Sequence, residues 1–153
     1  MNKIITAKWL LFVSSILILI GLAGCQNSED GVSQVSAETL AQGQQVYTAR
    51  CASCHGPTGE GQKPEAPLEP DETGRFPAPP HDGTGHTWHH DDDLLFRIVV
   101  EGGMGGDMFY EMPAFGESLS DDEIWAVLAH IKTMWTDEQR SIQHERTEAV
   151  RQQ

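Results

Sequence analysis

The stretch Cys51-Ala52-Ser53-Cys54-His55 decides how this chain is interpreted, because its spacing suits one kind of attachment chemistry. Two thiols three positions apart can reach the two vinyl groups of a haem, and the next side chain then presents an imidazole to the iron. The motif therefore predicts one covalently attached haem c, with thioether bonds from Cys51 and Cys54 and with His55 as an axial ligand of the iron.

Two other uses of a C-x-x-C pair fit the surrounding sequence less well. A thioredoxin-type redox disulfide lies between a strand and a helix, and no strand pattern precedes Cys51. A zinc site needs further thiol or imidazole ligands at suitable spacing, and the chain has no second C-x-x-C pair. Haem attachment is therefore the favoured interpretation of Cys51 and Cys54.

The length and charge of the chain narrow the classes of function. With 153 residues the chain is long enough for one domain of ordinary size and too short for two substantial ones. Ten basic against 23 acidic side chains give a net charge of -13, which excludes a general affinity for nucleic acids and disfavours anionic lipid headgroups. The 15 glycines and 8 prolines predict long irregular connections between helices.

The first segment is expected to direct export of the chain and not to join the fold. Residues 1–24 carry two lysines and then an apolar run, as in a secretory signal peptide. The run ends in Leu22-Ala23-Gly24-Cys25, which resembles the lipobox of bacterial lipoproteins, where the cysteine is lipidated. The alternative is an uncleaved membrane anchor, although the run is shorter than the roughly 20 residues that span a bilayer. Residues 25–36 are then interpreted as the lipidated cysteine followed by a flexible tether.

Helical periodicity appears in three segments after this tether. Apolar residues recur at helical spacing over 37–50, over 91–101, and in a stripe that starts after Ser120 and reaches Met134 or Trp135. Glu123 follows Ser120 at the spacing of a capping box. These patterns predict three helices in a domain over residues 37–136. Residues 137–153 contain few apolar side chains and are expected to form a solvated C-terminal extension.

The pattern as a whole resembles that of the class I c-type cytochromes, over about residues 37–135. Gly43 and Tyr47 stand eight and four residues before Cys51, as in that family, where they pack the N-terminal helix across the C-terminal one. Later in the chain comes the segment Met112-Pro113-Ala114-Phe115. The resemblance implies an all-α fold, with three to five helices wrapped around one covalently bound haem and long loops rich in glycine and proline.

The same resemblance implies two further contacts of the haem site. The residues alone leave Met104, Met108 and Met112 open as the second axial ligand, since any thioether suits the iron. The family's Met-Pro setting selects Met112. The family also has a proline twelve residues after the ligating histidine, whose carbonyl accepts the imidazole N–H, and Pro67 stands at that distance from His55.

Residues 81–93 crowd histidines and aspartates around Trp88 and keep a second hypothesis open. Imidazoles and carboxylates at such density can bind copper or zinc. The alternative is that Trp88 packs on the haem edge while the histidines contact a haem propionate or solvent. The four histidines concerned are His81, His86, His89 and His90.

Ligation at both faces of the iron would leave no open position for a substrate. We therefore expect an electron carrier and not an enzyme, with redox proteins that have basic docking surfaces as partners and with no small-molecule substrate. Lipidation at Cys25 would anchor this carrier to a bacterial membrane outside the cytoplasm. The alternatives are a metal-binding haem protein that uses residues 81–93 and a ligand sensor with a vacant distal site.

Overall fold

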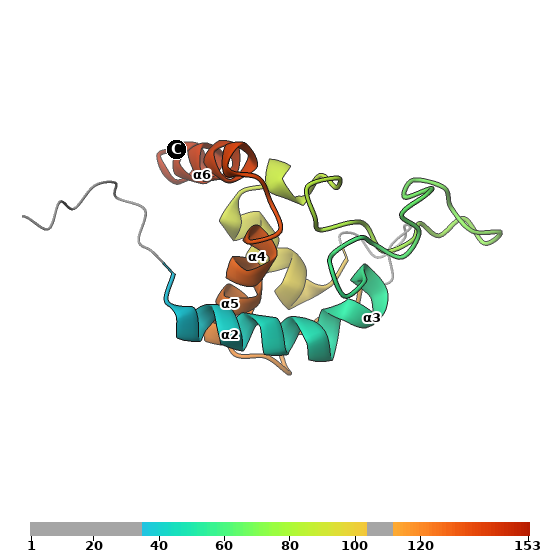
Figure 1. Ribbon diagram of the computed structural model, residues 1–153, viewed down its shortest axis with the longest axis horizontal. Coiled ribbons are helices and arrows are strands. Elements are labelled where there is room, and N and C mark those ends of the chain that lie inside the picture. The colour runs from blue at the N-terminus through green and yellow to red at the C-terminus, as the bar shows by residue number, and fades with distance from the viewer. Residues whose placement is uncertain (1–34, 104–111) are drawn as a thin grey trace, which may run out of the picture. The chain divides into compact units, whose positions relative to one another are not determined.

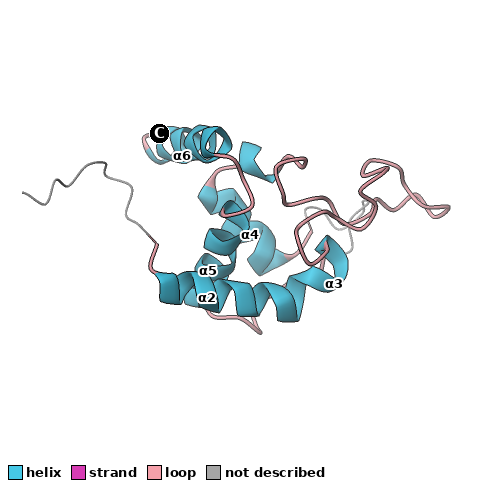
Figure 2. Ribbon diagram, in the orientation of Figure 1, coloured by secondary structure: helices cyan, strands magenta, loops and turns pink. Residues whose placement is uncertain are grey.

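The structure, a computed structural model, describes residues 35–103 and 112–153, and every regular element in these ranges is helical (Figures 1 and 2). The elements in chain order are α2 (Ala37–Val46), η1 (Tyr47–Cys51), α3 (Ala52–His55), η2 (Thr87–His89), α4 (Asp92–Glu101), α5 (Asp121–Lys132) and α6 (Asp137–Arg151). The expectation of an all-α domain is confirmed for the described residues. The expected leader and Cys25 lie outside them.

Helix α2 continues through η1 into α3, so that one helical run leads from residue 37 to His55. The Ser36 hydroxyl caps its start by accepting a hydrogen bond from the Thr39 N–H at 3.0 Å. One π-helical turn, η1, lies between Tyr47 and Cys51, and such turns shift the faces of a helix locally. The buried Tyr47 hydroxyl donates to the Gly56 carbonyl at 2.8 Å. This bond links Gly56, directly after the helical run, to Tyr47 in the middle of the run.

Helices α2 and α5 pack closely (Figure 1). Gly43 lies at their contact. A Cβ atom at Gly43 would lie 2.0 Å from the Ala126 carbonyl oxygen, so only glycine allows the two backbones to approach this closely. The predicted capping box is present at the start of α5. There the Ser120 N–H donates to Glu123 Oε2 at 2.9 Å, and the Glu123 N–H donates to Ser120 Oγ at 3.3 Å.

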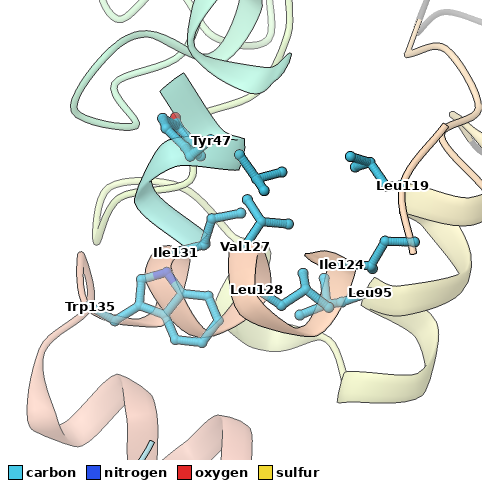
Figure 3. Close-up of a cluster of buried hydrophobic side chains, with 9 residues drawn as sticks. Tyr47, Leu95, Leu119, Ile124, Val127, Leu128, Ile131 and Trp135 are labelled. Carbon is cyan, nitrogen blue, oxygen red and sulfur yellow. The ribbon is translucent and has the colours of Figure 1, made fainter. Parts of the chain in front are cut away.

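The predicted stripe of α5 forms the centre of the hydrophobic core. Figure 3 shows its side chains together with Tyr47 from η1 and Leu95 from α4. Trp135 is 4% exposed and completes the stripe, whereas Met134 is only partly buried beside it. The buried members are Val46, Tyr47, Leu95, Leu119, Ile124, Val127, Leu128, Ile131 and Trp135.

Helix α6 is exposed along most of its length, but one of its faces packs against the rest of the domain. Gln143 and Thr147 are each 2% exposed. The Gln143 amide donates to Asp92 Oδ1 at 2.6 Å and to the His90 carbonyl at 3.2 Å, and the Asp92 N–H donates to Thr147 Oγ1 at 3.1 Å. The inward face of α6 is therefore held by hydrogen bonds, which a search for apolar periodicity does not detect.

Long loops join these helices, most of all between α3 and η2 (Figure 2). Helix α4 begins at the expected place, where the Asp91 carboxylate accepts from the Leu94 N–H at 2.9 Å, and it ends at Glu101, just before Gly102. Among the described residues, no helix combines the length and the apolar character that crossing a membrane requires.

Candidate haem site

The two cysteines of the motif lie within one turn of each other, at the junction of η1 and α3. Both are free thiols; Cys51 is half-buried and Cys54 is exposed. Burial, and next the neighbouring Cys54, raise the pKa of the Cys51 thiol to about 11. The thiol form therefore predominates at neutral pH. Because neither sulfur is in a disulfide, both are available for thioether bonds.

His55 is buried and has the protonation state that an iron ligand needs. Its Nδ1 lies 2.9 Å from the Pro79 carbonyl oxygen. Because a carbonyl only accepts, Nδ1 carries the proton and donates, and Nε2 keeps a free lone pair. Burial lowers the pKa of His55, and the bond to Pro79 opposes this shift in part. A neutral imidazole with its tautomer fixed in this way fits a haem iron.

The identity of the acceptor is a correction, since the sequence had predicted the Pro67 carbonyl. The loop between Gln62 and Ala78 folds back on itself. The Gln62 N–H donates to the Ala78 carbonyl at 2.9 Å, and the Ala78 N–H donates to Gln62 Oε1 at 3.1 Å. Pro67 lies inside this excursion, and the chain returns to His55 only at Pro79. A count of twelve residues fails here because the loop is longer than the family spacing assumes.

His81 was predicted as one member of a histidine cluster, and the structure places it against His55. The two imidazole rings are stacked, with centroids 3.9 Å apart and an angle of 22° between their planes. Burial, followed by the neighbouring imidazoles of His55 and His86, lowers the pKa of His81 to about 3. Its ring is therefore neutral at physiological pH. No feature of the sequence distinguished His81 from the other histidines.

The other histidines of residues 81–93 do not converge on one point. The His86 and His90 rings lie 5.4 Å apart, and His89 contacts Trp88 instead. Within the part of the chain that the structure describes, no three His, Cys, Asp or Glu side chains are grouped closely enough to hold a metal ion. The copper or zinc alternative therefore has no ligand set among these residues.

Trp88 is anchored by the protein itself. Its indole N–H donates to the Gly85 carbonyl at 2.9 Å, and its ring is partly buried against the hydrophobic core. The contact of Trp88 with the haem edge stays a prediction.

Met112 is the first described residue after residues 104–111. Its carbonyl accepts from the Gly103 N–H at 3.0 Å, and three residues later the Phe115 N–H donates to the Val99 carbonyl at 3.0 Å. These bonds hold the Met-Pro segment beside the end of α4. The Met112 side chain is half-buried. Met104 and Met108 lie outside the described residues, so the choice of Met112 as the second ligand stays a prediction.

The domain is helical, and one turn presents two thiols and an imidazole whose tautomer is fixed by a hydrogen bond. These features define a haem protein of the c type. Comparison with known families agrees, since residues 40–135 match the family described as cytochrome c. The chain belongs to this family, whose members carry a covalently attached haem c and generally serve as electron carriers. A search of curated proteins found no match.

Proposed function

We propose that this protein is a membrane-tethered, extracytoplasmic carrier of single electrons, with His55 and Met112 as the two axial ligands of its haem iron. The observation that carries the proposal is the arrangement at His55. Nε2 is free to bind iron because Nδ1 donates to the Pro79 carbonyl 2.9 Å away. The bound haem supplies a one-electron iron couple, and the protein supplies its attachment, ligands and surroundings.

The chain's own residues fulfil three tasks in this function. Cys51 and Cys54 fix the cofactor to the helical run, so that it cannot be lost outside the cytoplasm. His55 is kept neutral and oriented, which limits rearrangement when the iron changes oxidation state. Met112 is the expected soft ligand on the other face, and its support is the Met-Pro sequence beside α4. With both faces occupied, no position remains for a substrate.

The charge of the chain supports a particular kind of partner. Loss of residues 1–24 would remove Lys3 and Lys8 and no acid, which leaves 8 basic against 23 acidic side chains. Such a surface favours redox proteins with a basic docking patch. The rate of association with them should fall as the salt concentration rises, because salt screens the attraction.

Tethering through Cys25 is proposed from the sequence around it. The apolar run before Leu22-Ala23-Gly24-Cys25 supports export and lipidation. The acyl chains would hold the protein at the membrane, and residues 26–36 would let the haem domain reach partners nearby.

The proposal is tested by optical spectra of the oxidised and reduced holoprotein, including the weak near-infrared band of methionine sulfur bound to ferric haem. We expect the band in the wild type and in Met134→Leu, and its loss in Met112→Ala. Met134 is the matched control because its sulfur lies near Gly59 and it is not part of the Met-Pro segment. A wild type that lacks the band and binds carbon monoxide readily would indicate a vacant distal site and overturn the carrier function.

A further inference from the structure

The ring of His81 is held against His55 by bonds that do not involve His55. The His81 N–H donates to the Gly59 carbonyl at 2.7 Å, and the His81 carbonyl accepts from the Trp135 indole at 2.8 Å. Its Nδ1 lies 2.9 Å from the Thr87 hydroxyl. Three separate parts of the chain thus fix His81, so the stack is built into the fold and is not an accidental contact of two mobile side chains.

The hydrogen bonds also settle which nitrogen of His81 carries its proton. The Thr87 hydroxyl has a single proton, and it donates this proton to the Pro80 carbonyl at 3.3 Å. Towards His81 the hydroxyl can therefore only accept, so Nδ1 of His81 is the donor. The buried Thr87 fixes both the tautomer and the rotation of the His81 ring.

The stack has an electrostatic consequence for an iron ligand. An imidazole bound to ferric iron is more electron-poor than one bound to ferrous iron. The π face of a neutral aromatic ring attracts an electron-poor ring more strongly than an electron-rich one. The His81 ring is stacked on His55 with its centroid 3.9 Å away, so its π face favours the oxidised state.

We propose that His81 is a positioning residue for the proximal ligand: its stacked ring keeps the His55 imidazole in one orientation and lowers the reduction potential of the haem. This inference rests on the proposed function in one respect, that His55 ligates the iron. It adds a residue outside the C-x-x-C-H motif that sets the potential at which the protein exchanges electrons.

The test is a redox titration of the holoprotein in three variants at one pH. His81→Leu removes the aromatic face, and we expect its reduction potential to rise, with a change in the equilibrium constant for reduction of up to about tenfold. His81→Phe keeps an aromatic face and should stay closer to the wild type than His81→Leu. His144→Leu, at an exposed position of α6, is the matched control and should leave the potential unchanged.

A fourth variant covers the case in which His81→Leu does not take up haem. Thr87→Val removes the hydroxyl that orients His81 and leaves both rings in place, so a smaller rise in potential is expected. Equal potentials in the wild type, in Thr87→Val and in whichever His81 variants mature would overturn the inference. The near-infrared methionine band is recorded in each variant. Its absence from the wild type would contradict the proposed function, whereas its presence with unchanged potentials would contradict only the role of His81.

Discussion

Replacement of Gly43 by alanine tests whether the backbones of α2 and α5 meet as closely as the structure shows. The added Cβ would lie 2.0 Å from the Ala126 carbonyl oxygen and 2.6 Å from its carbonyl carbon. Side chains cannot relieve a clash with backbone atoms, so the helices would have to separate by about 1 Å. Overpacking of this kind costs about 3 kcal/mol, and the higher helix propensity of alanine returns about 1 kcal/mol.

The expected net loss for Gly43→Ala is thus about 2 kcal/mol of the free energy of unfolding, or a fall in Tm on the order of 8 °C. Urea unfolding of the holoprotein, followed by circular dichroism and by haem absorbance, measures it. Gln45→Ala is the control, since Gln45 is exposed on the same helix and its change should stay within about 0.5 kcal/mol. A Gly43→Ala protein as stable as the wild type would refute the close crossing.

Three further predictions follow from single contacts. Gln62→Ala removes the acceptor of the Ala78 N–H, which should loosen the adjacent Pro79 carbonyl and raise the reduction potential. Gln62→Glu keeps an acceptor and should leave the potential unchanged. A redox titration in which the two variants behave alike would contradict this prediction. Gln143→Leu should lower the free energy of unfolding in urea by about 1–3 kcal/mol, because it removes the amide that donates to the Asp92 carboxylate and to the His90 carbonyl, whereas an unchanged midpoint would mean that these two bonds add no stability. Burial lowers the pKa of His130, so as the pH falls the unfolded chain binds a proton at this histidine before the folded chain does. The free energy of unfolding should therefore decrease as the pH drops below about 6.5. In urea unfolding, His130→Leu should lose less stability than the wild type between about pH 7.5 and 5.5.

The parts of the fold that the sequence predicted are those set by local spacing. The cap at Ser120 and the stripe from Ile124 onward depend on residues within a few turns of one another, and both are confirmed. Gly43 and Tyr47 were read from their fixed offsets before Cys51, and both are buried where α2 leads into the haem motif. Offsets along one continuous helical run are preserved in space, so counting residues is a sound guide there.

Counting failed where the chain leaves the helix. The acceptor for His55 was placed at Pro67, but the two bonds between Gln62 and Ala78 close a loop that contains Pro67 and make Pro79 the partner. The packed face of α6 escapes sequence analysis for a different reason. Its buried positions, Gln143 and Thr147, are polar, and their partners lie more than 50 residues away in the chain. Neither contact leaves a periodic signal.

Two contacts of His55, its hydrogen bond to Pro79 and its stack with His81, offer a way to adjust the haem without altering the attachment motif. The bond to Pro79 and the stack with His81 both come from the loop after α3, and the Gly61 N–H also donates to the His55 carbonyl at 2.8 Å. The helical run supplies the thiols and the imidazole, whereas the loop determines how that imidazole is oriented and what surrounds it. Substitutions in the loop should therefore shift the reduction potential while Cys51 and Cys54 still carry the haem, which separates the control of the potential from the control of attachment.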